Sequence, residues 1–96
     1  MVNPTSARRR IRELARAGRY FITGYCALRL LQRVITEGDV VAALTGASVC
    51  RPQSNGRWKV EGDDEDGETL LLVVELQKGV VVVTAYRGDE GDDDED

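Results

Sequence analysis

Three side chains spaced four residues apart form the constellation in this sequence that most suggests chemistry. Tyr25, Arg29 and Arg33 fall on one stripe of a helix predicted over residues 24–34. A phenol can transfer protons, and guanidinium groups can stabilise the charge that builds up on phosphate when RNA is cleaved. Tyr86, in the last predicted strand, is a second such phenol. These four residues are the candidate catalytic set.

The sequence contains no His, which is the side chain that titrates near neutral pH without help. A tyrosine whose pKa lies near its usual value of about 10 is a poor base, so catalysis requires a neighbouring arginine that lowers the pKa of Tyr25 or Tyr86. Structural alternatives are a half-buried Tyr25 ring, helix arginines that face solvent or pair with carboxylates, and strand packing of Thr84 and Tyr86.

The two cysteines, Cys26 and Cys50, are too few and too widely spaced for a zinc site, and no C-x-x-C occurs. Two buried free thiols are a better interpretation than a disulfide. No metal and no cofactor is expected. We see neither a signal peptide nor an apolar run near the about 20 residues of a membrane span, so a cytoplasmic protein is expected.

Charge is unevenly distributed along the chain. Residues 1–60 carry eleven Lys/Arg against three Asp/Glu, a net +8, and residues 61–96 carry two against fourteen, a net −12, which together give −4. The first part offers a basic surface to RNA, whereas residues 88–96 are expected to be a disordered acidic tail. The predicted nucleic-acid contacts are Arg8, Arg9, Arg12, Arg16, Arg29 and Arg33, and the alternative for them is a solvated arginine face.

The stretch 69–86 is the only part of the chain apolar enough to seed a core. It predicts two antiparallel strands around the turn 77–79, and both faces of this hairpin are largely apolar. Such a sheet needs covering on both sides. Helices can cover one side, and a loop, a protein partner or a second copy can cover the other, which suggests a homodimer through the sheet.

The remaining elements are predicted from caps and turns. We expect a helix over 7–17 capped by Thr5 or Ser6, a short β-like run over 19–22, and a Thr23 cap on the helix that carries Tyr25. Thr36 and Asp39 indicate a capping box that opens a third helix, and strands follow on both sides of an Asn-Gly turn at 55–56. The predicted fold is α+β, with helices packed on one face of a four-stranded antiparallel sheet.

Residues 22–36, followed by Asp39-Val40 and Ala43-Leu44, resemble a family of small prokaryotic domains of unknown function. That family reads I-T-x-H-A-x-x-R-[LM]-x-x-R-x-I-[ST]-x-x-D-V-x-x-A-L, and its later half, G-x-x-L-H-V-V and V-x-V-x-T-x-Y, is similar to residues 67–76 and 80–86. The resemblance implies a RelE/MqsR-like architecture, as in small ribonuclease toxins. The chain then divides into a basic N-terminal helix (1–19), the RelE/MqsR-like domain (20–87) and the acidic tail (88–96).

By resemblance, Arg29, Arg33, Thr84 and Tyr86 occupy family positions, whereas Tyr25 and Leu71 stand where the family has histidines. The resemblance implies an antitoxin-like protein partner or RNA as ligand. Because both imidazoles are missing, we expect a diverged toxin-family domain that binds protein or RNA without catalysis. The alternative is an active toxin-type endoribonuclease that works without histidine.

Overall fold

The structure is a computed structural model that describes residues 3–87, in which three helices and five strands occur. The order of the elements is α1 (Pro4–Arg16), β1 (Tyr20–Ile22), α2 (Gly24–Arg33), α3 (Glu37–Thr45), β2 (Val49–Pro52), β3 (Trp58–Asp63), β4 (Thr69–Leu76) and β5 (Val80–Arg87). The expectation of a disordered acidic tail at 88–96 concerns residues outside the described part.

Side-chain caps begin each helix. Asn3 accepts a hydrogen bond from the Ser6 backbone N–H at 2.8 Å, and Pro4 fits the first turn because it needs no intrahelical donor. Helix α1 therefore begins earlier than predicted, and the prediction of Thr5 or Ser6 as its cap is wrong. The Thr23 cap of α2 is confirmed, since its hydroxyl accepts from the Cys26 N–H at 3.0 Å.

The predicted capping box of α3 is also confirmed. The Asp39 N–H donates to the Thr36 hydroxyl at 3.0 Å, and the Thr36 N–H donates to the Asp39 carboxylate at 3.1 Å. Gly46 ends this helix. A local pattern of four residues thus sets the start of α3.

The sheet differs from the prediction. It has five strands in the order β1-β5-β4-β3-β2, and β1 pairs with β5 in parallel, while the other three pairs are antiparallel. The predicted four-stranded antiparallel sheet of RelE/MqsR type is therefore wrong. The short β-like run predicted at 19–22 belongs to this sheet as β1, although the predicted sheet did not include it. A strand of three residues carries too little sequence pattern to indicate a partner strand sixty positions away.

A close backbone approach fixes this extra strand. The Val80 N–H donates to the Arg19 carbonyl at 3.0 Å, beside Gly79. A Cβ at Gly79 would lie 2.7 Å from that carbonyl oxygen, so glycine is what lets the β4–β5 turn meet the start of β1.

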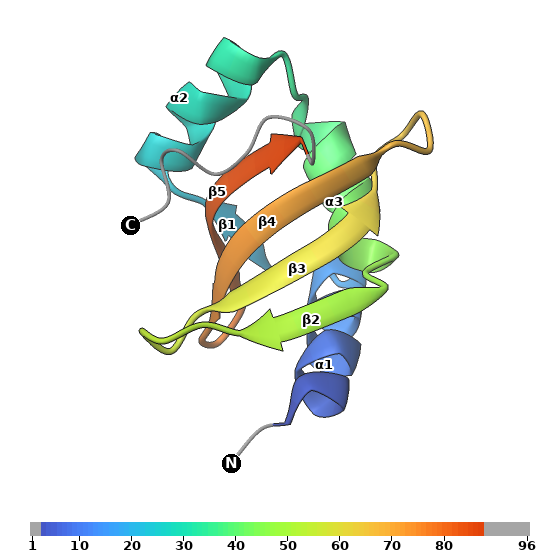
Figure 1. Cartoon of the computed structure of the whole chain (residues 1–96), viewed down its shortest axis with the longest axis vertical. Coiled ribbons are helices and arrows are strands. Elements are labelled where there is room, and N and C mark those ends of the chain that lie inside the picture. The colour runs from blue at the N-terminus through green and yellow to red at the C-terminus, as the bar shows by residue number, and fades with distance from the viewer. Residues whose placement is uncertain (1–2, 88–96) are drawn as a thin grey trace.

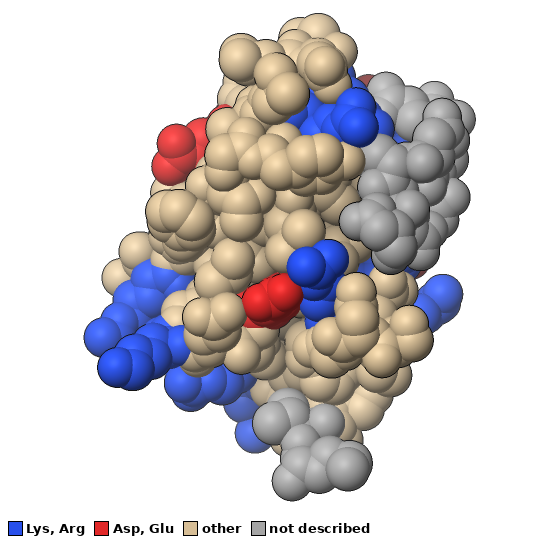
Figure 2. All heavy atoms as spheres, turned by 90° about the vertical axis from the view of Figure 1, so that its left-hand side faces the viewer, with Lys and Arg blue, Asp and Glu red and all other residues tan. Residues whose placement is uncertain are grey.

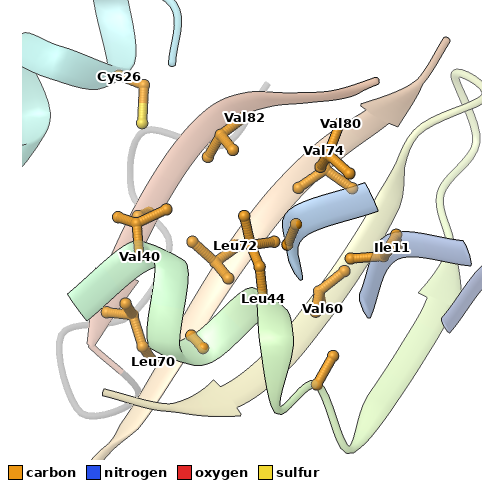
Figure 3. Packing of buried hydrophobic residues seen from close by; sticks show 14 of the residues in the cluster. Ile11, Cys26, Val40, Leu44, Val60, Leu70, Leu72, Val74, Val80 and Val82 are labelled. Atoms are coloured by element: carbon orange, nitrogen blue, oxygen red, sulfur yellow. The ribbon is translucent and has the colours of Figure 1, made fainter. Parts of the chain in front are cut away.

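One face of the sheet carries the core. Helices α1 and α3 cover this face, and α2 lies beside β5 (Figure 1). Figure 3 shows Ile11 of α1 and Leu44 of α3 among strand side chains such as Leu72, with Cys26 of α2 above Val82. The buried stripe of α1 consists of Ala7, Ile11, Leu14 and Ala15. Helix α1 is thus part of the same core as the strands.

The opposite face, which we call the second face, carries the alternate residues of each strand. A one-residue register shift separates Val73 and Val74, so that Val73 lies opposite Thr84 whereas Val74 lies opposite Val82. Such a shift reverses the alternation of β5. It turns Thr84 and Tyr86 onto the second face, and it turns Ala85 toward the core.

Candidate nucleic-acid interface

Helix α1 presents the densest group of basic residues. Arg9 and Arg10 are exposed, and Figure 2 shows basic side chains gathered at the lower left, on the side where α1 runs. We call Arg8, Arg9, Arg10, Arg12 and Arg16 the α1 arginine surface. Four of these five are the α1 residues predicted to contact nucleic acid.

Three arginines of this surface are also anchored to backbone. Arg8 donates to the Ser48 carbonyl at 3.2 Å, while Arg12 and Arg16 each donate to the Thr45 carbonyl at 3.3 Å. Thr45 is the last residue of α3, where a cation favourably meets the unsatisfied carbonyls and the negative end of the helix dipole. Arg12 and Arg16 therefore cap α3, and all three arginines are anchored on the surface by backbone carbonyls.

The predicted stripe on α2 exists, and we call Tyr25, Arg29 and Arg33 the α2 stripe. The Arg29 Nε–H donates to the Tyr25 hydroxyl at 3.0 Å, and the guanidinium carbon lies 5.0 Å from the centre of the Tyr25 ring. Another Arg29 nitrogen donates to Gln32 at 3.0 Å. The prediction that this stripe forms one surface is confirmed as far as Tyr25 and Arg29 are concerned.

Arg33 reaches the sheet. Its guanidinium donates to the Ala85 carbonyl at 3.0 Å, on the part of β5 beyond the end of its pairing with β1. The Thr23 hydroxyl lies 3.4 Å from the neighbouring edge carbonyl, that of Val83. Side chains at the start and end of α2 thus supply donors to an edge of β5 that has no neighbouring strand among residues 3–87.

Thr84 and Tyr86 flank Ala85, whose carbonyl Arg33 contacts, and their side chains lie on the second face. Both residues are only 4% exposed. The Lys59 ammonium lies 5.8 Å from the centre of the Tyr86 ring. The four candidate catalytic residues are therefore divided, because Tyr25 is 44% exposed on α2 whereas the Tyr86 side chain is buried on the sheet.

A shallow depression of about 400 Å³ adjoins Tyr25 on the second face. Its polar wall is the ion pair of Arg57 Nε with Glu75 at 2.9 Å, and this hydrogen bond holds the pKa of Glu75 below its usual value. Val81 and Val83 form its apolar wall. The depression can accept a flat or apolar group beside the Tyr25 ring.

One charged network was missed from the sequence. Arg87 donates to the buried Asp64 and lies 3.8 Å from Asp39, while the Asp64 carboxylate also accepts from the N–H groups of Asp66 and Glu68 at 2.9 Å. It joins the acidic loop after β3, the start of α3 and the end of β5. In the sequence, Asp39 indicates only a capping box, and no pattern joins it to Asp64 or Arg87.

Hydrogen bonds set the pKa values of this network. The Glu68 N–H holds the pKa of Asp64 below its usual range, with further help from Arg87, and the Thr36 N–H does the same for Asp39. The hydrogen bond to Asp64 raises the pKa of Arg87. All three groups are therefore charged at neutral pH, and the network stabilises the fold.

The cysteines are buried free thiols, as predicted. Burial raises the pKa of both Cys26 and Cys50 to about 11, although Arg33 and Arg8 respectively oppose the shift. Within residues 3–87, no group of three or more Cys, Asp or Glu side chains could hold a metal ion. Trp58 is partly buried and packs against the core.

The outer side of α2 is apolar and exposed. Leu31 is 80% exposed and Val34 is 82% exposed, and Leu28 and Phe21 are also exposed. Val34 moreover adopts a left-handed conformation with φ of 56°, which is unfavourable for a β-branched residue. Figure 2 shows the side of the molecule that carries α2 and β1 as largely uncharged.

Comparisons of the chain with protein-family models, with curated proteins and with solved structures gave no match. The family resemblance of residues 20–87 stays a prediction. No helix in the part of the chain that the structure describes is both long enough and apolar enough to cross a membrane.

Proposed function

We propose that this chain is a non-catalytic RNA-binding module that contacts the RNA backbone through the α1 arginine surface. The observation that supports the proposal is the density of charge on one short helix. Five arginines and a single acidic residue, Glu13, lie within the 13 residues of α1. Such a surface is the electrostatic footprint of a polyanion site.

The way in which these arginines are held also favours phosphate binding. Arg8, Arg12 and Arg16 are already ordered because they donate to backbone carbonyls. These side chains therefore lose little conformational entropy when RNA binds. Guanidinium groups match phosphate oxygens with two parallel hydrogen bonds. Contacts of this kind carry no base information, so we expect binding that tolerates many sequences.

Burial argues against the endoribonuclease alternative. A general acid or base must come within hydrogen-bond reach of the RNA 2′-OH or of the leaving oxygen. Tyr86 is 4% exposed and lies on the second face, apart from the exposed Tyr25. The candidate catalytic residues therefore do not present two accessible proton-transfer groups.

Affinity for a fluorescein-labelled single-stranded RNA tests the proposal. The full chain is compared with the double variant Arg9→Gln/Arg10→Gln, which removes two exposed charges of α1 and leaves the anchored arginines in place. Two surface charge contacts correspond to a loss of roughly tenfold in affinity. The matched control, Arg51→Gln/Lys78→Gln, removes the same charge elsewhere on the surface and is expected to change affinity less than about twofold.

Equal losses in the two double variants would contradict the assignment to α1. The RNA recovered from each reaction should also be intact. Cleavage that disappears in Arg29→Ala/Arg33→Ala would replace the binding module by the nuclease alternative.

The exposed apolar side of α2 favours a second candidate function, self-association. Leu28, Leu31 and Val34 contribute almost nothing to the monomer core, and the left-handed Val34 costs about 1–2 kcal/mol of stability. Exposed apolar patches of this kind mark interaction surfaces. A second copy of the chain that presents the same patch would bury both.

Sedimentation velocity over a range of concentrations tests this candidate. The wild-type chain should associate as concentration rises, and Leu31→Glu should shift it to monomer because association would bury an unpaired carboxylate. Ser54→Glu adds the same charge at an exposed turn away from α2 and should associate like the wild type. A wild-type chain that stays monomeric at every concentration contradicts self-association.

A further inference from the structure

Strand β5 ends next to cationic side chains of α2 and β3. We propose that the acidic segment 88–96 docks on a surface that we call the α2–β5 face and define by Tyr25, Arg29, Arg33 and Lys59. This inference concerns a different surface from the α1 arginine surface. It does not depend on RNA binding.

Charge complementarity is the first reason for this assignment. Seven of the nine residues in 88–96 are Asp or Glu, and the other two are Gly. The α2–β5 face carries three cationic side chains, those of Arg29, Arg33 and Lys59. A segment with seven carboxylates is complementary to it in charge.

Position is the second reason. Arg33 donates to the carbonyl of Ala85, two residues before the end of β5, and Lys59 lies 5.8 Å from the ring of Tyr86, one residue before that end. Arg87, which residues 88–96 follow directly, is therefore one or two positions from the strand residues that these cations contact. Nine extended residues span at most about 30 Å, so the segment is long enough to follow the whole ten-residue helix α2, about 15 Å.

Tethering is the third reason. Because the segment is joined to the face by one or two residues, docking is intramolecular, and its effective concentration is on the order of millimolar. The α1 arginine surface is the other cationic surface, but α1 lies on the opposite side of the sheet from the second face (Figure 1). A short tether thus favours the α2–β5 face and keeps the acidic segment apart from α1.

A spin label on the segment tests the proposal in the full chain. Asp92→Cys supplies an accessible thiol, and the native Cys26 and Cys50 are buried, so a nitroxide reagent at neutral pH modifies position 92 selectively. In a ¹H–¹⁵N spectrum the label broadens nearby amide signals. The proposal expects broadening of residues 25–33 and of Lys59, with α1 unaffected.

Two charge variants of the labelled chain complete the experiment. Arg29→Gln/Lys59→Gln removes two charges from the face but keeps Arg33, which bonds to the sheet, and it should reduce the broadening at least severalfold. Arg9→Gln/Arg10→Gln makes the same charge change on α1 and should leave the broadening as in the parent. Salt at about 1 M, where the screening length is roughly 3 Å, should reduce it too.

Broadening centred on α1, or none on α2, would overturn the proposal. Equal broadening in both charge variants would overturn it as well. RNA is absent from every sample, so a failure here is distinct from a failure of RNA binding.

Discussion

Arginine side chains serve two purposes in this domain. Arg8, Arg12 and Arg16 satisfy carbonyls near the end of α3, and Arg33 satisfies a carbonyl on the edge of β5. Each remains a cation on a surface. The sequence shows the charges but not which backbone group each one meets, because the partners lie about 30 to 50 positions away.

The Asp39–Asp64–Arg87 network makes stability depend on pH. Both carboxylates have a pKa below the usual value in the folded chain, so their contribution is complete above the unfolded pKa of about 3.9 and is lost as pH falls through the folded pKa. We expect the urea midpoint to be level from about pH 5 to about pH 8 and to fall below about pH 4.

Replacing Arg87 should make this acid-dependent loss smaller. Arg87→Gln removes one cause of the low pKa of Asp64, so the folded pKa moves toward the unfolded value and the variant should lose less stability on acidification than the wild type. Arg51→Gln, at an exposed position, should leave the profile unchanged. Identical profiles for the wild type and Arg87→Gln would show that the network does not couple stability to pH.

At the scale of elements, α3 and β3 pack closely at Gly62. Among the described glycines, Gly62 has the least space for a Cβ atom. A Cβ at Gly62 would lie 2.1 Å from the Ala43 carbonyl oxygen, and backbone cannot move aside as a flexible side chain can. Gly62→Ala is therefore expected to lower the free energy of unfolding by about 1–3 kcal/mol or more.

A second glycine provides the matched control. Gly24 opens α2, and a Cβ added there would meet nothing within 4 Å, so Gly24→Ala should change stability by about 1 kcal/mol at most and in the stabilising direction. Urea denaturation of both variants checks the difference. A Gly62→Ala variant as stable as Gly24→Ala would contradict the close packing of α3 on β3.

Local signals explain which elements were predicted. The Thr23 cap and the Thr36–Asp39 capping box each lie within four residues, and the α2 stripe follows from helical spacing, so all three could be found in the sequence. The parallel β1–β5 pair could not, because it joins distant segments. The one-residue register shift in the β4–β5 pair could not be predicted from the sequence either, although it decides which face Thr84 and Tyr86 occupy.

The whole molecule combines a net charge of −4 with a strongly basic helix. At physiological ionic strength, charges more than about 8 Å apart are largely screened from one another. A phosphate at the α1 arginine surface therefore responds to the nearby guanidinium groups and much less to the acidic residues on the other side of the sheet. Local charge, and not net charge, decides whether RNA binds.

Salt dependence of the RNA affinity is the sharpest check on binding through α1. If α1 contacts about three phosphates of a single strand, the logarithm of the association constant should fall with the logarithm of salt concentration with a slope near −2, at about −0.7 per phosphate. Arg9→Gln/Arg10→Gln should make the slope shallower by about 1.4. A slope near zero for the wild type, or an unchanged slope in this double variant, would contradict RNA binding through α1.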